Sequence, residues 1–393
     1  MESSRIMKNT PAGLFPEDWV VVQLGTKASV FRGGSPRPID SFLTNDPDGI
    51  NWIKIGDVAV GAKYIKQTEE KIIPEGAARS RKVNAGDFLL SNSMSFGRPY
   101  ILQIDGCIHD GWLVIQEYYD TFETDYLYYA LNAGYVLEQY KSMAAGSSVL
   151  NLNKDIVKRV HVAVPSRSEQ KIIADALSGV DNMIGALDEA ITKKRQIKEG
   201  LMQQLMTGKT RLPGFSGEWV ELELGAILSY EQPGPFLVHS TDYVETGIPV
   251  LTAGKTFILG YTNENFGIYD KLPVIIFDDF VTESKFVDFP FKAKSSAMKM
   301  LSLRDKTRHN IRFIYDVMQL IDFPMTDHKR WWIAEYSHLK VRVPASIEEE
   351  NAIANTFSSI DAEIHSLESQ RDKYRLIKQG MMQELLTGKT RLI

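Results

Sequence analysis

Cysteine is nearly absent from this sequence, since Cys107 is the single cysteine among 393 residues. One cysteine excludes an intrachain disulfide and a cysteine-rich zinc site, and it suits a reducing compartment such as the cytosol. Long apolar runs are missing too, because no hydrophobic stretch approaches the roughly 18 residues of a membrane-spanning helix. Residues 1–11 are polar and unlike a signal peptide. We therefore expect a soluble, cytoplasmic protein with no membrane partner.

Positive charge is not in excess either. Lys and Arg number 45 and Asp and Glu number 50, which gives a formal net charge of −5 at pH 7. A protein that holds DNA by itself through many phosphate contacts is usually basic. The charge therefore indicates either that the chain does not bind DNA, or that its basic residues form patches and a partner supplies further positive charge.

Recognisable catalytic motifs are also lacking. GKT triplets begin at Gly208, Gly254 and Gly388, but none has the glycine that a phosphate-binding loop carries five residues earlier. The seven histidines show no metal-ligand spacing, and no nucleophile elbow, kinase signature or glycine-rich cofactor loop is present. We expect a recognition protein that is not an enzyme and that binds no metal or cofactor itself.

One enzymatic alternative stays open on the residues alone. A cluster in the second half of the chain resembles a metal-dependent nuclease core, in which carboxylates hold divalent ions beside a lysine. The spacing is short and the first half has no counterpart, so the other interpretation is a charged turn at a strand edge. The four residues concerned are Asp278, Asp279, Glu283 and Lys285.

What the sequence does contain is one long repeat. RQIKEGLMQQLMTGKTRL at 195–212 returns without a gap as RLIKQGMMQELLTGKTRL at 375–392, an offset of 180 residues. A tryptophan segment repeats as well, from Trp19 to Trp219, at an offset of 200. A long period seen only twice is not a solenoid, so the chain is one unit written twice. The segments in between differ almost completely, as two related readers of different targets would; ordinary drift after duplication is the other interpretation.

Each repeat predicts a long helix, after Pro165 in the first copy and after Pro344 in the second. Capping-box spacing opens both helices, and apolar residues follow at steps of three and four, with a slip near Lys194. A helix with one apolar stripe is unstable alone, so we expect the two to pack as an antiparallel pair. The alternative is that each helix folds back on its own globular segment. The expected packing residues are Leu177, Val180, Ile184, Leu187, Ile197, Leu201, Phe357, Ile360, Ile364, Leu367, Ile377 and Met381.

The globular segments contain short apolar runs between turn signals, which predict short strands with a few helices, the best of them from Asp125 to Lys141. We predict an α+β fold: two globular α/β domains joined by two long antiparallel helices, with pseudo-two-fold symmetry. The C-terminus stops where the N-terminus takes up, so the two ends should lie close together in a circular topology. The expected parts are an N-terminal tail 1–16, a first domain 17–165, a central helix and connector 166–212, a second domain 213–344 and a C-terminal helix 345–393.

Basic residues cluster within both globular segments. Arg, Lys, Ser and Asn on loops are the side chains that read base edges and phosphates. Ordinary solvated surface charge is the other interpretation of each cluster. The candidate DNA-binding residues are Arg32, Ser35, Arg37, Arg79, Arg81, Lys82, Arg98, Ser147 and Lys154 in the first segment, and Lys255, Lys285, Lys294, Lys299, Lys329 and Arg330 in the second.

Two divergent segments that alternate with two near-identical long helices resemble the DNA specificity subunit of type I restriction-modification systems. The resemblance covers nearly the whole chain and rests on a combination of stretches. These are FRGGSPRPI at 31–39, INWIKIGDV at 50–58, VPSRSEQKIIADALSGVD at 164–181, GIPVLTAGK at 247–255, the segment 274–291, and the helix ends MTGKTRL at 206–212 and LTGKTRL at 386–392.

The resemblance implies a complete arrangement of partners. The globular domains would be target recognition domains, each reading one half of a split, asymmetric site in double-stranded DNA. The helix pair would set the distance between the halves and dock two methylation subunits, which bind S-adenosylmethionine and methylate adenine. Two restriction subunits, when present, would hydrolyse ATP with Mg²⁺ and cut DNA. The chain itself would be non-catalytic; a helical scaffold that binds proteins instead of DNA is the remaining alternative.

Overall fold

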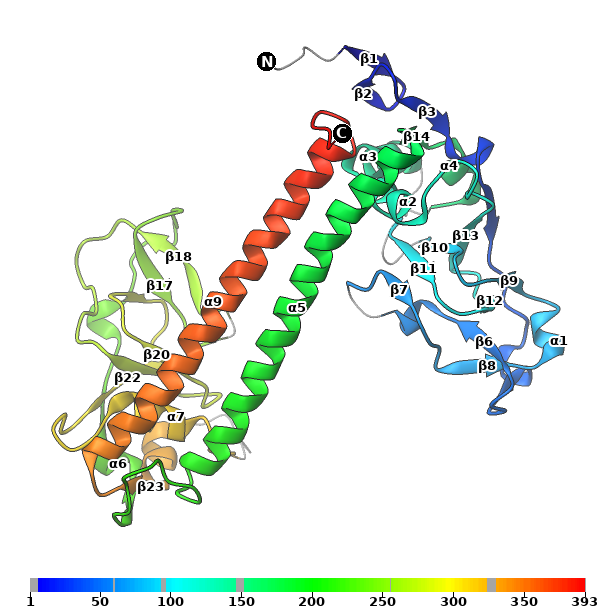
Figure 1. Cartoon of the computed structure of the whole chain (residues 1–393). Coiled ribbons are helices and arrows are strands. Elements are labelled where there is room, and N and C mark those ends of the chain that lie inside the picture. Colours follow the sequence, from blue (N-terminus) through cyan, green and yellow to red (C-terminus); the bar gives the residue numbers. More distant parts are fainter. Residues whose placement is uncertain are drawn as a thin grey trace. The chain divides into compact units, whose positions relative to one another are not determined.

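The structure is a computed structural model that describes residues 6–58, 61–92, 97–145, 152–254, 256–323 and 330–392. It divides into two compact units. Unit 1 comprises Met1–Leu187 with Gln370–Ile393, and unit 2 comprises Asp188–Ser369. Each unit contains one globular domain and one half of each long helix, α5 (Arg167–Leu205) and α9 (Ile347–Leu385) (Figure 1).

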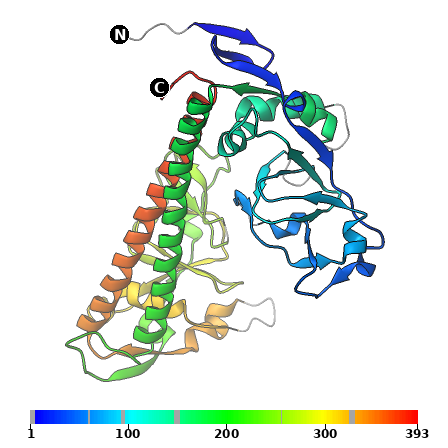
Figure 2. The ribbon, with the colours of Figure 1, turned by 45° about the vertical axis from the view of Figure 1, so that its right-hand side comes forward.

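The two long helices pair in antiparallel fashion within each unit. In unit 1, Lys378 Nζ lies 2.6 Å from Asp181 Oδ1. In unit 2, Lys198 Nζ lies 2.6 Å from Asp361 Oδ1. Each residue of the second pair lies 180 positions from its equivalent in the first. From one pair to the other, the residue number in α5 rises from 181 to 198 while that in α9 falls from 378 to 361, so the helices run antiparallel. In both units the helices lie side by side (Figure 2), so the predicted antiparallel pair is confirmed. The distance that the pair sets between the two globular domains stays a prediction.

The apolar stripe is interrupted near Lys194, but the positions that face α9 keep their spacing of three and four. Lys194 and Lys198 occupy two of these positions, and their ammonium groups pair with carboxylates of α9. Ile197 therefore falls outside the seam and is 44% exposed, as is its counterpart Ile377 at 40%. Of the other expected packing residues, Leu177, Leu187, Phe357 and Ile364 are buried, and Val180, Ile184, Leu201, Ile360, Leu367 and Met381 are half-buried.

The repeated residues of unit 1 meet at one junction. Glu169, in the first turn of α5, is buried and accepts hydrogen bonds from Arg391 through both of its carboxylate oxygens, each at 2.6 Å. The Trp19 indole donates to the same carboxylate at 3.1 Å. Arg391 also reaches Asp18 at 2.9 Å, so the two ends of the described chain lie together as predicted. Glu169 is thereby diverted from the expected capping box, of which only the Ser166 half forms.

Unit 2 contains the same junction in its own copy. The Arg211 guanidinium binds both oxygens of the Glu349 carboxylate and lies over the Trp219 ring, 5.8 Å from its centre. Gly208 and Gly388, which follow the two helices, have φ of +70° and +68°, a conformation typical of glycine after a helix. Both glycines pack directly against their unit's tryptophan. The two repeats therefore share the arginine–glutamate pair and the glycine–tryptophan contact, whereas the indole hydrogen bond of Trp19 is not repeated at Trp219.

The prediction of an N-terminal tail is wrong for residues 7–16. They form an antiparallel hairpin of β1 (Met7–Thr10) and β2 (Gly13–Pro16). Phe15 is buried and its ring stacks on Trp19 with centroids 6.3 Å apart. This region is polar in composition apart from a few residues, and the packing of Phe15 on Trp19 attaches the hairpin to unit 1.

The first globular domain consists of two five-stranded sheets, ordered β4-β13-β10-β11-β7 and β5-β8-β6-β12-β9, and a two-stranded pair β14-β3. One apolar core joins the first sheet to the start of α5 and the end of α9. The expected helix from Asp125 to Lys141 is divided in two, because Ala133 is extended. The elements are β3 (Val20–Gln23), β4 (Ser29–Arg32), β5 (Leu43–Thr44), β6 (Ile50–Ile53), β7 (Tyr64–Ile65), β8 (Glu70–Ile72), α1 (Pro74–Ala77), β9 (Arg81–Val83), β10 (Phe88–Ser91), β11 (Pro99–Leu102), β12 (Gly106–Ile108), β13 (Trp112–Gln116), α2 (Thr124–Leu131), α3 (Gly134–Ala144), α4 (Lys154–Arg159) and β14 (His161–Val164).

The second globular domain reproduces the frame with fewer strands. Its sheet β16-β22-β19-β20 corresponds to β4-β13-β10-β11, and its pair β15-β23 corresponds to β3-β14. A three-stranded sheet β18-β17-β21 completes it. Among the described residues, no helix is both long and apolar enough to cross a membrane. The elements are β15 (Trp219–Glu223), α6 (Leu224–Ile227), β16 (Leu228–Glu231), β17 (Ile248–Leu251), β18 (Ile258–Thr262), β19 (Val274–Asp278), β20 (Ser284–Val287), β21 (Lys292–Ala293), β22 (Met298–Leu303), α7 (Ile311–Met318), α8 (Trp331–Ala334) and β23 (Lys340–Pro344).

The junction yields a first prediction. Replacing Arg391→Ala leaves the buried Glu169 carboxylate without its guanidinium, which we expect to cost unit 1 about 3–5 kcal/mol of unfolding free energy. Urea unfolding of the full chain, with hydrogen exchange in the first turns of α5, measures the loss. Arg375→Ala is the control, because its pair with Asp372 lies on the surface, where such pairs contribute about 0–1 kcal/mol. Equal losses in the two variants would contradict the role assigned to the junction.

Candidate nucleic-acid interface

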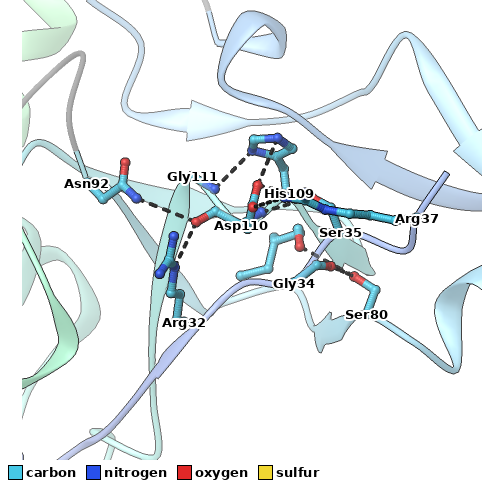
Figure 3. Close-up of polar contacts among 10 residues, drawn as sticks. Arg32, Gly34, Ser35, Arg37, Ser80, Asn92, His109, Asp110 and Gly111 are labelled. Carbon is cyan, nitrogen blue, oxygen red and sulfur yellow. Dashed lines mark hydrogen bonds and ion pairs between the residues drawn. The ribbon is translucent and has the colours of Figure 1, made fainter. Parts of the chain in front are cut away.

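In unit 1, β4 and β10 end at one side of the sheet, where the strand between them, β13, begins. Arg32 at the end of β4 is paired with Leu113 of β13, and Ser91 at the end of β10 is paired with Trp112 of the same strand. The turn that follows β4 is held to this side, because Gly33 N–H donates to the Trp112 carbonyl at 2.8 Å. Polar side chains from three chain segments therefore meet here (Figure 3).

Asp110 is the centre of these polar contacts (Figure 3). The Ser35 hydroxyl donates to its Oδ1 at 3.1 Å, and the Arg37 guanidinium lies 3.4 Å from Oδ2. Its main-chain carbonyl accepts from Arg32 Nε at 3.1 Å and from the Asn92 amide at 3.4 Å. One residue thus orients two arginines, a serine and an asparagine, which are the side-chain types that read base edges.

The charge on Asp110 is stabilised by these neighbours. Partial burial raises the pKa of Asp110, but the hydrogen bond from Ser35 opposes that effect. The positive charges of Arg37 and Arg32 add to the lowering, so the pKa of Asp110 lies below its ordinary value. The carboxylate is therefore ionised near neutral pH and keeps its hold on Arg37.

His109 has a defined ring tautomer in this cluster. Its Nδ1 accepts a hydrogen bond from Gly111 N–H at 2.9 Å, so the ring proton lies on Nε2. Nε2 is 3.0 Å from Asp110 Oδ1. Sequence inspection missed both His109 and Asp110, because neither belongs to a basic cluster or a motif.

Beside this cluster lies a basic hollow of about 500 Å³. Arg32, Arg81 and Lys154 line it together with Asn92. Arg81 stacks on Phe31, 4.7 Å from the ring centre, which fixes its direction. The fold therefore brings together three predicted DNA-binding residues that lie up to 122 positions apart in the sequence.

The remaining candidates of unit 1 are placed differently. Arg79 stacks on Phe42, Arg98 stacks on Tyr100, and Lys82 is exposed on β9. The described lining of the hollow contains none of these three. Ser147 lies outside the described residues.

In unit 2 the structure corrects one candidate outright. Lys299 is 1% exposed and pairs with the buried Asp279 at 3.0 Å, so the prediction that it contacts DNA is wrong. It points inward because it lies at a core-facing position of β22. Lys285 and Lys294 are half-buried and Arg330 is exposed, while Lys255 and Lys329 lie outside the described residues.

Two carboxylates of the nuclease alternative make structural contacts instead. Asp279 pairs with Lys299, and Asp278 Oδ1 accepts the main-chain N–H groups of Phe280 and Val281 at 2.8 and 3.2 Å. Within the described ranges, no group of three or more His, Cys, Asp or Glu could hold a metal ion. The residues form a charged turn at a strand end, which was the other interpretation.

Lys292 forms a second buried ion pair in unit 2. Its ammonium group is fully buried, lies 2.8 Å from Glu264 Oε2 and sits 4.3 Å from the centre of the Phe266 ring. Glu264 also accepts the N–H groups of His239 and Ser240 at 3.0 and 2.9 Å. The Lys292 hydrogen bond is the largest of the effects that lower the pKa of Glu264 to about 2.

Residues 16–199 match the family described as the type I restriction modification DNA specificity domain. The matched stretch spans the first globular domain and most of α5, and over it the chain resembles this family. A similar protein is the EcoR124I/EcoR124II specificity subunit of Escherichia coli, 46% identical over 176 residues that span 41% of this chain and 43% of that protein. The MjaVIII specificity subunit of Methanocaldococcus jannaschii is 24% identical over 416 residues, 96% of this chain and 94% of that one.

A solved structure supports the fold. The S subunit of a type I restriction-modification system from M. genitalium matches with a TM-score of 0.62 and 14% identity, over 93% of this chain and 96% of that chain. The predicted α+β class with two globular domains and two long helices is therefore confirmed. The relatives are named as specificity subunits of type I restriction enzymes, which supports a role of this chain in DNA sequence recognition. Its base-contacting residues stay predictions.

The Lys292–Glu264 pair predicts a pH dependence for unit 2. Because the pKa of folded Glu264 is depressed, its stabilising effect is complete above the ordinary carboxyl pKa of 4.5 and is lost as the pH falls from there toward 2. We expect the wild-type chain to lose more unit-2 stability over this window than Glu264→Gln, which does not titrate. Urea unfolding at pH 6, 4 and 3 measures the difference, and parallel pH profiles for the two proteins would contradict it.

Proposed function

We propose that this chain is a specificity subunit that reads a two-part, asymmetric DNA site, with one half read by each globular domain. The observation that supports the proposal is that both domains share one strand frame but differ at the edge where their strands end. Unit 1 presents Arg32, Arg81 and Lys154 around a hollow, whereas unit 2 buries Lys292 and Lys299. Like frames with unlike reading edges suit two different half-sequences.

Within unit 1 we assign different tasks to the residues at the edge. Arg32 and Asn92 are held by the Asp110 carbonyl, and their donor groups suit guanine and adenine respectively. Arg81 and Lys154 carry positive charge at the rim of the hollow, which suits phosphates. Base reading and phosphate binding then come from neighbouring side chains of one site.

Two methylation subunits dock on the long helices in this proposal. Ile197 and Ile377 support it, because they are exposed apolar residues at equivalent positions of α5 and α9. Two equivalent apolar positions suit two copies of one partner. S-adenosylmethionine would be bound by those subunits, and ATP with Mg²⁺ by two restriction subunits. The net charge of −5 supports a further contribution from partners to phosphate binding.

Co-expression with the neighbouring methylation subunit, followed by mapping of methylated adenines across the host genome, tests the proposal. We expect one motif composed of two unlike half-sequences separated by unspecified bases. A single continuous motif would contradict two-part reading. Methylation without any sequence preference would indicate a scaffold that binds proteins rather than a DNA reader.

Variants of unit 1 separate base reading from phosphate binding. Arg32→Ala should lower discrimination at one base pair of one half-sequence by about 1–3 kcal/mol. Lys154→Ala should weaken binding to all sequences alike and reduce the salt slope of log K by about 1. Titrations of the complex with duplexes at 50–200 mM salt measure both effects. Lys141→Ala is the control, since Lys141 is exposed on α3 and pairs with Glu138; an equal effect of this variant would remove the assignment.

A further inference from the structure

The strand ends that carry the candidate DNA-binding residues of unit 1 have a topological counterpart in unit 2. In unit 1, Asn92 N–H donates to the Gly111 carbonyl at 3.1 Å, and Leu152 N–H donates to the Asn92 carbonyl at 2.8 Å. In unit 2, Asp279 N–H donates to the Ala297 carbonyl at 3.2 Å, and Trp331 N–H donates to the Asp279 carbonyl at 3.0 Å. Asn92 and Asp279 therefore occupy the same place in the frame.

Near Asn92 the exposed side chains are basic, whereas near Asp279 they are apolar. Ile333 follows Trp331 by two residues, as Lys154 follows Leu152, so an isoleucine takes the place of the lysine. Apolar side chains around the unit 2 edge are left in solvent. The four are Tyr230, Phe280, Val281 and Ile333, which are 41%, 44%, 42% and 53% exposed; we call them the apolar face.

Contacts within unit 2 connect the members of the apolar face. Tyr230 and Ile333 line one hollow of about 470 Å³ together with Trp332. Asp279, which precedes Phe280, accepts a hydrogen bond from Trp332 N–H at 2.9 Å. Phe280 and Val281 are thereby tied to the segment that carries Ile333.

The turn that presents Phe280 and Val281 is held firmly. Asp278 Oδ1 accepts both of their N–H groups, and the buried Asp279–Lys299 pair anchors the base of the turn. Thr282 has φ of +56°, which is strained for a β-branched residue and costs the fold stability. A strained, anchored turn that exposes two apolar side chains indicates a contact made with another molecule.

We propose that the second globular domain contacts its half of the DNA through the apolar face, by stacking on or packing against bases rather than by charge. The inference rests on the proposed function and names the chemistry of its second half-site. DNA is favoured over a protein partner, because Ile333 takes the position of Lys154, and Phe280 follows Asp279, which is the counterpart of Asn92 at the basic hollow of unit 1. Tyr230 lies beside them, in the strand position that Val30 has in unit 1. Aromatic and apolar side chains stack on bases, contact thymine methyl groups, and wedge between base steps.

The two chemistries differ in their response to salt. Basic residues displace counterions from phosphates, so their contribution to affinity falls steeply as salt rises. Apolar contacts with bases displace no counterions. The apolar face should therefore contribute affinity that stays constant from 50 to 200 mM salt, whereas Lys154 of unit 1 contributes to the salt slope.

The test uses the full chain in complex with its methylation subunit. Duplexes selected by the wild-type complex from a random pool define the two half-sequences, and titrations at 50–200 mM salt give affinity and slope. We expect the double variant F280A/V281A to bind about 10-fold or more weakly at an unchanged slope. Selection with this variant should relax the preference within one half-sequence and leave the other intact.

Two further variants control for folding and for general loss of apolar surface. Phe280→Leu keeps an apolar side chain and should retain most of the affinity if the turn is intact. Val244→Ala removes the same methyl groups as V281A from a valine of unit 2 that is 38% exposed, and should change neither affinity nor preference.

The outcomes are distinguishable. Unchanged affinity and preference in F280A/V281A, or a reduced salt slope, would overturn the apolar face as the base contact. Failure of this variant to bind the methylation subunit in size-exclusion chromatography would make the face a protein contact and overturn it as well. Absence of any selected sequence with the wild-type complex would instead refute the proposed function.

Discussion

A buried carboxylate held by an arginine at both of its oxygens is the contact on which each unit depends. Glu169 and Glu349 lie in the first turns of α5 and α9, and Arg391 and Arg211 follow the opposite helix ends. Bidentate, charge-assisted hydrogen bonds fix geometry more strictly than apolar contacts do. They set the register of the antiparallel pair, and they hold the helix ends against the tryptophan where each globular domain begins.

The number of contacts that a residue makes explains which parts of the two repeats are alike. Residues at the junctions contact several elements at once, so each copy needs the same arginine, glutamate, glycine and tryptophan. The side chains at the strand ends make different contacts in the two copies, since Asn92 binds the Asp110 carbonyl and its counterpart Asp279 pairs with Lys299. Unit 1 presents Arg32, Arg81 and Lys154 there, and unit 2 presents Phe280 and Ile333. A shared frame with unlike strand ends is what the proposed reading of two different half-sequences requires.

Several sequence-based expectations failed for one reason, namely that local pattern does not reveal burial. Ile197 looked like a seam residue, but Lys194 and Lys198 continue the seam through ion pairs. Lys299 looked like a surface cation, but it lies at an inward position of β22 opposite Asp279. Asp110 attracted no notice, although it orients Arg32, Ser35 and Arg37. Each outcome depends on residues distant in the sequence.

The sequence by itself determined the duplication, the two long helices, their antiparallel pairing and the meeting of the chain ends, because repeats and helical periodicity are local properties of the chain. Tertiary structure alone decided which polar and apolar side chains share a reading edge. Residues such as Arg32, Arg81 and Lys154 come from different elements, and only the order of strands in the sheet places them around one hollow. Strand order results from long-range packing, which no short stretch of sequence specifies.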